Sequence, residues 1–180
     1  VHPRVEGLAP GTEHFYRFVV GPQTSPVGRF VTLPAAGSAA DDFTVGLISC
    51  QAWYHGHFAA HRHLAQEEDL DLTVFLGDYI DRGPDSAGIL SRLRTLAWRE
   101  PESVTCLMGN HEQMMLEAYR DPHGASTWLS NGGRQTLRSF GITGPEAFPP
   151  DVLTWLSYLP TVHEDAAHYF VHAGFRPGRT

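Results

Sequence analysis

Cysteine is scarce in this sequence, and long hydrophobic runs are absent. Only two cysteines, Cys50 and Cys106, occur among 180 residues, so we expect no disulfide framework. No apolar run approaches the ~18 residues of a membrane-spanning helix, so we expect no membrane span. Basic residues are also few, because 13 Lys and Arg stand against 20 Asp and Glu, for a net charge of -7. This balance argues against a nucleic-acid backbone as the main partner.

The remaining composition is ordinary for a globular protein, with 42% hydrophobic and 18% charged residues. The length suits one domain, or one domain plus a fragment of another. Eleven histidines are a high count and suggest a metal-binding hypothesis, although we expect most of them at the surface. The chain begins with Val1 rather than methionine, and we interpret it as a piece of a longer protein.

The most informative stretch is residues 72–83. Residues 72–76 form an apolar run that predicts a buried strand, and Gly77 allows a sharp turn where the strand ends. Asp78, Asp81 and Arg82 follow directly. In open α/β sheets, functional sites lie beyond the carboxyl ends of the strands, so these side chains are candidate site residues.

Two further stretches repeat this arrangement of an apolar strand followed by polar residues. Residues 105–109 lead into Asn110, His111 and Glu112, and residues 168–171 lead into His172. Asp, Asn and His are all metal-ligand types, so the three strand ends together predict a metal site.

These motifs resemble those of the calcineurin-like metallophosphoesterases, in particular the bacterial phosphatases related to Ser/Thr protein phosphatases, the PPP type. Residues 77–83 match Gly-Asp-x-x-Asp-Arg-Gly, residues 109–112 match Gly-Asn-His-Glu, and residues 172–174 match His-Ala-Gly. The resemblance covers residues 72–178 and includes the Trp-Leu-Ser-Asn-Gly-Gly-Arg stretch at 128–134. The first PPP motif and a closing Gly-His that supplies another histidine ligand are missing from this sequence.

The earlier part of the chain resembles a different branch of the superfamily, the PhoD-type alkaline phosphatases. Ser49-Cys50-Gln51 follows the predicted strand 43–49, as in that branch, and residues 1–80 fit it as a whole. The two resemblances imply different locations, which are outside the cytoplasm for PhoD-type enzymes and inside it for PPP-type enzymes.

The order of predicted elements indicates a layered α/β sheet flanked by helices. We expect strands at 43–49, 72–76, 105–109 and 168–171, and helices at 57–68, 86–100, 110–119, 150–158 and from 126, broken near 132–133. Residues 1–33 resemble the C-terminal strands of an incomplete fibronectin III-like β-sandwich, 34–42 form a linker by composition, and 43–180 form the metallophosphoesterase domain, truncated at its C-terminal end.

The resemblance implies a metal ligand role for Asp78, Asn110 and His172, with Asp78 bridging two ions. Ordinary alternatives are a turn aspartate after a strand and a histidine satisfied within the core. Cys50 and His55 compete for the position of the missing first motif. Cys50 stands at its strand end as Asp78 does, so a thiolate there would face the same metal. A small buried packing residue is the alternative for Cys50.

The resemblance also implies catalytic roles. His111 would act as general acid toward the leaving group, Asp81 would accept its ring N–H, and Arg82 would grip phosphate oxygens with its planar fork. The alternative for Arg82 is a solvated loop arginine that pairs with Asp85 or Glu112.

The implied activity is metal-dependent hydrolysis of phosphate monoesters by direct attack of a metal-bound hydroxide. The cofactors would be two metal ions, drawn from Mn, Fe, Zn or Ca, and the substrate a phosphorylated small molecule or a phosphoprotein. One alternative is a phosphodiesterase or dinucleotide polyphosphate hydrolase. Another is a degenerate metal-binding module without catalytic activity, because the motif set is incomplete.

Overall fold

The structure is a computed structural model that describes residues 5–32, 35, 43–50, 59–67, 69–165 and 168–175. The strands are β1 (Glu13–Tyr16), β2 (Val19–Val20), β3 (Gln23–Thr24), β4 (Gly28–Val31), β5 (Val45–Ile48), β6 (Leu72–Phe75), β7 (Val104–Cys106), β8 (Val162–Glu164) and β9 (Tyr169–Val171). The α-helices are α1 (Ala59–Leu64), α2 (Ser86–Arg99), α3 (Asn110–Arg120), α4 (Ser126–Trp128), α5 (Arg134–Phe140) and α6 (Pro150–Ser157). Shorter helical turns are η2 (Pro122–Gly124), η3 (Leu129–Gly133) and η4 (Pro145–Ala147).

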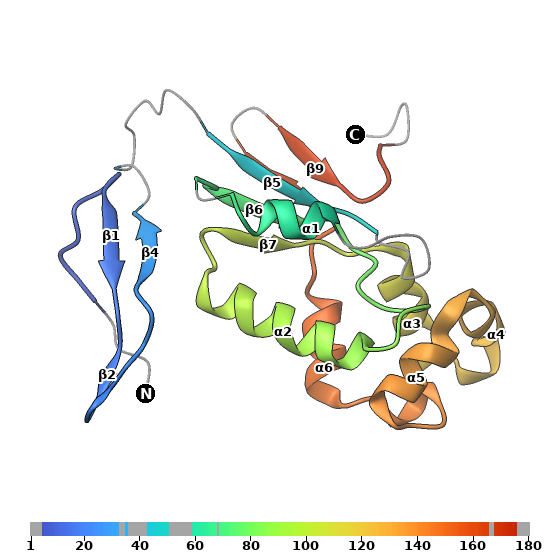
Figure 1. The fold of residues 1–180 in the computed structure, drawn as a ribbon. Coiled ribbons are helices and arrows are strands. Elements are labelled where there is room, and N and C mark those ends of the chain that lie inside the picture. Colours follow the sequence, from blue (N-terminus) through green and yellow to red (C-terminus); the bar gives the residue numbers. More distant parts are fainter. Residues whose placement is uncertain are drawn as a thin grey trace.

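A parallel sheet with the order β5-β6-β7 positions the candidate site (Figure 1). The register places Ile48 opposite Phe75 and Phe75 opposite Cys106. The carboxyl ends of the three strands therefore meet at one edge of the sheet. The segments that leave this edge carry Cys50 and Asp78 after β5 and β6, and the start of α3 after β7.

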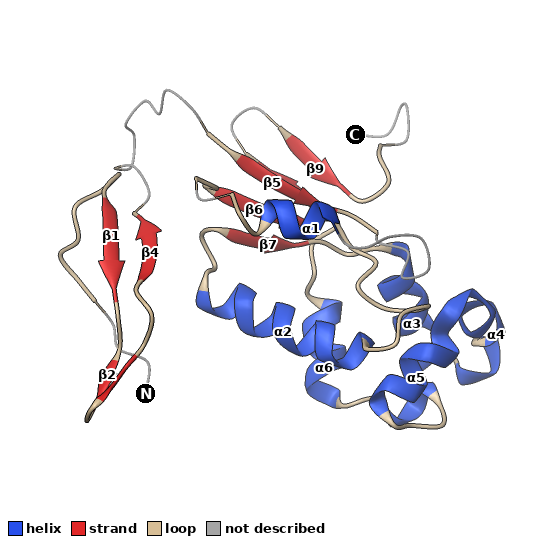
Figure 2. Ribbon diagram, in the orientation of Figure 1, coloured by secondary structure: helices blue, strands red, loops and turns tan. Residues whose placement is uncertain are grey.

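The two faces of β6 pack into separate hydrophobic clusters, because successive side chains of a strand point to opposite faces. Leu72 and Val74 pack with Phe170 of β9, whereas Phe75 packs against a larger cluster that includes the fully buried Trp128. Residues of α2 to α6 contribute most of this larger cluster. These helices lie together on one side of the sheet, with α4 and α5 beyond the strands (Figure 2).

Most of the predicted elements are confirmed. The Asp85 side chain caps α2 by accepting the Gly88 N–H at 3.0 Å, as expected for a helix that begins at Ser86. The predicted break near residues 132–133 is also present, because Gly132 adopts a φ of 116° within η3. Of the predicted helix 57–68, the described part is helical only over α1.

The C-terminal strand pairs differently from its neighbours. Residues 169–171 form β9 as predicted, but β9 pairs antiparallel with β8, a strand that we did not predict. β8 is only three residues long and reads Val-His-Glu, so it lacks the apolar run that would have marked it. β9 does not pair with β5, β6 or β7, and it contacts the sheet through the side chain of Phe170, which packs with Leu72 and Val74 of β6.

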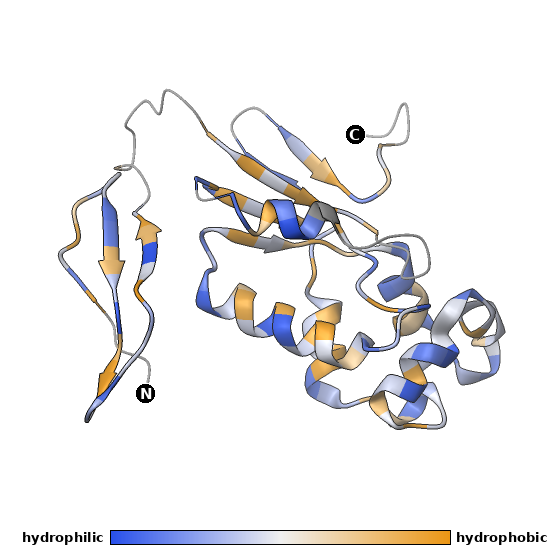
Figure 3. Ribbon diagram, viewed as in Figure 1, coloured by the Kyte–Doolittle hydropathy of each residue, from blue (hydrophilic) through white to orange (hydrophobic). Residues whose placement is uncertain are grey.

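The N-terminal strands form two antiparallel pairs, β1 with β4 and β2 with β3. Apolar side chains of these strands remain largely exposed, including Phe15 at 65% and Val20 at 74%, and Figure 3 shows apolar segments along them. An ion pair between Arg29 Nη2 and Asp69 Oδ1, at 3.6 Å, connects β4 to the α/β part. The fibronectin III-like assignment stays a prediction, and most of the predicted linker lies outside the described residues.

None of the helices in the described part of the chain is long and apolar enough to cross a bilayer.

Gly132 allows a close approach that a side chain would prevent. A Cβ at this position would lie 2.7 Å from both Arg82 N and Arg82 Cγ, and its φ of 116° also disfavours other residues. We expect Gly132→Ala to lower the free energy of unfolding by about 3 kcal/mol, because strain and a backbone clash combine. Equilibrium urea denaturation measures this loss.

Gly141 provides the matched control. Its φ is also positive, at 67°, but a Cβ there would meet nothing within 4 Å. Gly141→Ala should therefore cost only about 1 kcal/mol, from backbone strain alone. An equal loss of stability in both variants would show that the contact with Arg82 contributes nothing.

Candidate metal centre and acid-base pair

The loop that follows β6 has a strained backbone. Asp78, Asp81 and Arg82 all lie in the left-handed region, with φ values of 60°, 71° and 57°. Each such residue costs about 1–2 kcal/mol relative to ordinary backbone. Strain of this kind persists only where surrounding contacts fix the conformation. The contacts that fix this loop therefore determine where its carboxylates and its arginine point.

Glu112 supplies one set of these contacts. Its side chain is fully buried and accepts the N–H groups of Asp78 at 2.8 Å, Tyr79 at 2.7 Å and Gly109 at 2.9 Å. Burial raises the pKa of Glu112, and the backbone amides oppose this increase by stabilising the carboxylate. The sequence suggested Glu112 only as an alternative partner for Arg82. Its actual role is to join the loop after β6 to the start of α3.

Cys50, Asp78 and His172 form a cluster of ligand-type atoms. One ligand atom from each residue lies within 4.8 Å of the other two. Cys50 Sγ lies 3.2 Å from Asp78 Oδ2, and His172 Nε2 lies 3.4 Å from Asp78 Oδ1. Thiolate, carboxylate and imidazole are the ligand types that bind Zn and Fe.

The orientation of His172 indicates that the cluster suits a cation. The carbonyl oxygen of Leu76 accepts from His172 Nδ1 at 2.8 Å, so in the neutral ring Nδ1 carries the proton and Nε2 presents a lone pair. That lone pair faces Asn110 Oδ1 at 3.1 Å and Asp78 Oδ1. A cation placed among these three acceptors would be bound by all of them at once.

The thiol of Cys50 keeps its proton beside the Asp78 carboxylate. Its pKa is raised, mainly by burial and further by the Asp78 carboxylate, while the Ser49 hydroxyl partly opposes the increase. The protonated thiol donates to Asp78 Oδ2. A cation at the cluster would take the place of that proton. His55, the competing candidate, lies outside the described residues.

His111 and Asp81 form a buried pair beside this cluster. His111 Nδ1 lies 2.6 Å from Asp81 Oδ2, and both residues are only 7% exposed. The hydrogen bond to Asp81 is the main reason that the pKa of His111 is raised, and it outweighs the opposing effect of burial. The backbone N–H of His111 donates to Asp78 Oδ1 at 3.2 Å, which links the pair to the ligand cluster.

Two residues that the sequence did not suggest as site residues contact Asp81 directly. Trp128 Nε1 donates to both carboxylate oxygens of Asp81, at 3.1 and 3.0 Å, and Thr136 Oγ1 donates to Oδ1 at 2.7 Å. Trp128 belongs to the family-like stretch 128–134, but nothing in that stretch indicated a contact with Asp81. Thr136 lies beyond it and carried no sequence signal.

Arg82 and several of the residues above line one pocket of about 590 Å³. Its lining includes Cys50, Asp78, Asp81, Arg82 and His111. Arg82 Nε donates to the carbonyl oxygen of Asn131 at 3.2 Å, and its exposed side chain borders the pocket. The structure therefore brings together every predicted site residue that lies in its described part. Asn110 and His172 join through the ligand cluster.

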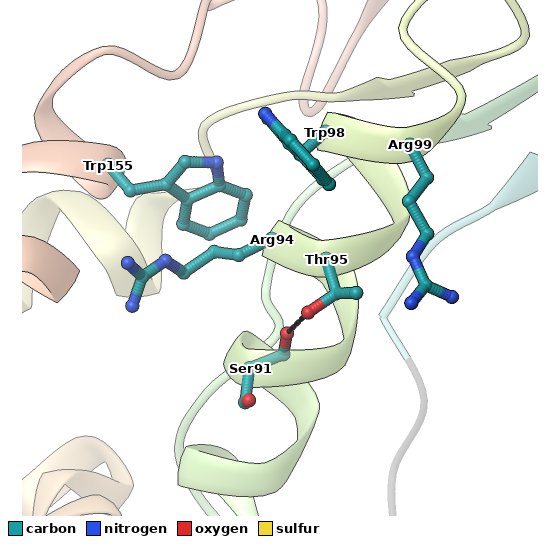
Figure 4. Close-up of a pocket in the computed structure, with 6 residues that line it drawn as sticks. All are labelled: Ser91, Arg94, Thr95, Trp98, Arg99 and Trp155. Carbon is teal, nitrogen blue, oxygen red and sulfur yellow. Dashed lines mark hydrogen bonds between the residues drawn. The ribbon is translucent and has the colours of Figure 1, made fainter. Parts of the chain in front are cut away.

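A second pocket, of about 540 Å³, shares no lining residue with the first (Figure 4). Trp98 and Trp155 border it together with Arg94, which pairs with Asp151 at 2.8 Å. The six residues that line it include no Asp, Glu, His or Cys, so this pocket offers no set of metal ligands.

Metal binding should protect Cys50 from alkylation, because a bound thiolate is no longer free to attack. We expect iodoacetamide to modify Cys50 about 10-fold more slowly in zinc-loaded protein than in chelator-treated protein. Cys106 is the internal control, since it is buried and its pKa is raised to about 12, so it should react slowly in both states. Peptide mass mapping over time measures both rates.

Replacement of the thiol by a carboxylate gives a second measurement. Cys50→Asp should shift metal preference from Zn or Fe toward Mn or Mg, because a carboxylate is the harder ligand. Cys50 is exposed, so it is not the buried packing residue of the alternative interpretation. Equal alkylation of Cys50 in both states, with no change of preference in Cys50→Asp, would show that Cys50 is not a metal ligand.

A model of the PhoD-like phosphatase family matches residues 43–128. The match begins where we predicted the α/β domain to begin. It also extends beyond residue 80, where we expected the PhoD-like resemblance to end, and it includes the loop after β6 and all of α3 and α4.

Individual relatives fall into several groups. Alkaline phosphatase D of Bacillus subtilis (strain 168) is 36% identical over 132 residues, which are 72% of this chain and 22% of that protein. Serine/threonine-protein phosphatase 1 of Salmonella typhimurium (strain LT2) is 39% identical over 110 residues, covering 58% of this chain and 46% of that protein. The symmetrical bis(5'-nucleosyl)-tetraphosphatase of Bordetella pertussis (strain Tohama I) is 32% identical over 115 residues, which are 64% of this chain and 36% of that protein.

The chain therefore spans less than half the length of each of these relatives. Both resemblances inferred from the motifs, to PhoD-type and to PPP-type phosphatases, are present along it. These matches, together with the motifs that surround the ligand cluster, support a relationship of this chain to the metallophosphoesterase superfamily.

Proposed function

We propose that this chain forms part of a metal-dependent phosphatase that hydrolyses phosphate monoesters. The observation that carries the proposal is the position of the ligand cluster beside the buried His111–Asp81 pair. Cys50 and Asp78 of the cluster line the same pocket as His111 and Arg82. Metal ligands, a proton donor and a fixed cation in one pocket are the parts that phosphate ester hydrolysis requires.

Asp78, Cys50, His172 and Asn110 are the proposed metal ligands, with His55 as a further candidate outside the described residues. We expect two ions, with Asp78 between them, because a carboxylate can offer one oxygen to each. Bound ions of this kind supply an activated water and neutralise the phosphoryl oxygens. The thiol of Cys50 favours Fe or Zn over Mn or Ca.

The acid-base pair accounts for the departure of the leaving group. Asp81 Oδ2 accepts from His111 Nδ1, so Nε2 is the ring nitrogen that can carry a proton to the leaving oxygen. Asp81 also holds the ring in one orientation and one tautomer. Arg82, on the same loop, presents a planar guanidinium that can bind two phosphoryl oxygens at once. Substrates of this class are phosphorylated small molecules or phosphoproteins.

A second candidate function is hydrolysis of diesters or dinucleotide polyphosphates. The similarity to the Bordetella tetraphosphatase favours it, as does the apolar wall that Ile80, Ile89 and Leu93 form in the pocket. Arg92 lines the same pocket and suits a second anionic group on a longer substrate.

We also propose that residues 1–33 are the C-terminal strands of a fibronectin III-like domain, that 34–42 are a linker, and that 43–180 belong to the metallophosphoesterase domain. The antiparallel pairing of β1 to β4 supports the first part of this division. The start of the family match at residue 43 supports the domain boundary.

Turnover of three substrates tests these proposals. The purified chain is loaded separately with Mn, Fe, Zn or Ca and assayed with p-nitrophenyl phosphate, bis(p-nitrophenyl) phosphate and diadenosine tetraphosphate. Faster metal-dependent turnover of the monoester supports the first proposal, and faster turnover of either other substrate supports the second. Tight metal binding without turnover of any substrate would indicate a degenerate module.

Substitutions of His111 and Asp78 should have different effects. His111→Ala removes the proton donor and leaves the metal ligands in place, so it should lower kcat for phenyl phosphate by about 10²–10⁴-fold and retain metal. Asp78→Asn should lower the metal content itself, because an amide is a weaker ligand than a carboxylate. Elemental analysis and kinetic assays measure the two effects, and full metal content with full activity in both variants would disprove the assignments.

A further inference from the structure

The helical segment from α4 to α5 binds the strained part of the loop that follows β6. Four of its residues make the contacts. Trp128 and Thr136 bind the carboxylate of Asp81, while the carbonyl oxygens of Asn131 and Gly132 accept from Arg82 Nε and Arg82 N at 3.2 and 3.4 Å. Asp81 and Arg82 are two of the three left-handed residues of the loop. The segment therefore fixes the loop at both of these residues.

The hydrogen bonds of Thr136 have one consistent arrangement. Its hydroxyl has a single proton, which it donates to Asp81 Oδ1, because a carboxylate can only accept. It must then accept from the backbone N–H of Asp81 at 2.9 Å, and also from the Ser86 hydroxyl at 3.2 Å. Thr136 is fully buried, so water does not compete for these bonds.

The carboxylate of Asp81 is saturated in the same way. Oδ1 accepts from Thr136 and Trp128, and Oδ2 accepts from His111 and Trp128. The terminal torsion of an aspartate is broad, so a single bond to His111 would leave the carboxylate plane free to rotate. Donors on both oxygens remove that freedom and hold Oδ2 toward His111 Nδ1.

We propose that Trp128 and Thr136 are positioning residues for proton transfer, which act on His111 through Asp81; this inference rests on the proposed function. Neither residue lines the pocket, so neither is expected to touch the substrate. Their hydrogen bonds fix the direction of the ring nitrogen that delivers the proton to the leaving oxygen.

A purely structural role makes a different prediction. Trp128 is 1% exposed and packs against Phe148, with ring centroids 6.0 Å apart, so it also belongs to the core. Loss of packing would lower stability and would affect all substrates alike. Loss of positioning affects mainly substrates whose leaving group needs a proton. The dependence of kcat on the leaving group therefore separates the two roles.

The kinetic test compares phenyl phosphate, which has a poor leaving group, with 2,4-dinitrophenyl phosphate, which has a good one. We expect Trp128→Phe and Thr136→Val to lower kcat for phenyl phosphate by about 10-fold or more, as for residues that orient catalytic groups, and to lower kcat for the dinitrophenyl ester by less than about 3-fold. Thr136→Ser retains the hydroxyl and should restore the wild-type ratio of the two kcat values. Metal content should stay unchanged in all three variants.

Trp155→Phe is the matched control, because Trp155 lies in the second pocket (Figure 4). It should leave the ratio unchanged. Equal losses on both substrates in Trp128→Phe and Thr136→Val, or the same loss in Thr136→Ser as in Thr136→Val, would overturn the inference. If Thr136→Val does not fold, the comparison of Trp128→Phe with Trp155→Phe decides.

A measurement without turnover separates failure of this inference from failure of the proposed function. Tryptophan indole N–H signals are recorded by NMR in wild type and in Asp81→Asn, with Trp128→Phe used to assign the Trp128 signal. A bond to a charged acceptor is stronger than one to a neutral amide, so the Trp128 signal should move upfield and the Trp155 signal should stay.

The combined outcomes are decisive. An unmoved Trp128 signal in Asp81→Asn would overturn the inference even if wild type is active. A wild-type protein without metal-dependent turnover would disprove the proposed function. In that case the NMR result alone would decide whether Trp128 positions Asp81.

Discussion

A buried carboxylate joins the two loops that carry most of the candidate site. Glu112 is fully buried and accepts three backbone N–H groups, two from the loop after β6 and one from Gly109 at the start of α3. An unsatisfied buried donor costs about 1–3 kcal/mol. Loss of the Glu112 side chain would leave three backbone N–H groups without this acceptor, so several such costs would add together. The same bonds hold Asp78 in its left-handed conformation, and Asp78 in turn orients Cys50 Sγ and the backbone of His111. The ligand cluster and the His111–Asp81 pair therefore depend on one acceptor that belongs to neither.

The approach of these two loops also explains their glycines. A Cβ at Gly77 would lie 2.5 Å from Gly109 N, and a Cβ at Gly109 would clash with the backbone N and the carboxylate of Asp78. From the sequence alone, we interpreted Gly77 as the residue that lets the chain turn after the strand. Its φ of 114° agrees with that interpretation, but contact between the loops is a second and independent requirement.

The sequence could predict those site residues that directly follow a strand along the chain. Asp78, Asp81, Asn110 and His111 follow directly after buried strands, and parallel neighbours in register bring such strand ends together. The closeness of Cys50 to Asp78 was predicted on the same basis. The contacts of Asp81 with Trp128 and Thr136 could not be predicted, because they join residues 47 and 55 positions apart and depend on how α4 and α5 pack. The pairing of β9 with β8 was missed because β8 carries no apolar run.

The site divides into two halves that share one loop. The ligand cluster takes its atoms from the ends of β5, β6 and β9, whereas the acid-base pair depends on α3 and on the segment from α4 to α5. Asp78 and Asp81 stand only three residues apart, yet each is held by a different partner, Glu112 for the first and Thr136 for the second.

This division provides a reason for the strained backbone of the loop that carries both carboxylates. Left-handed turns at Asp78 and at Asp81–Arg82 redirect the chain, so that one carboxylate faces the ligand cluster and the other faces the helical segment. The strain therefore accompanies the placement of the ligand cluster and the His111–Asp81 pair beside each other on a single short loop.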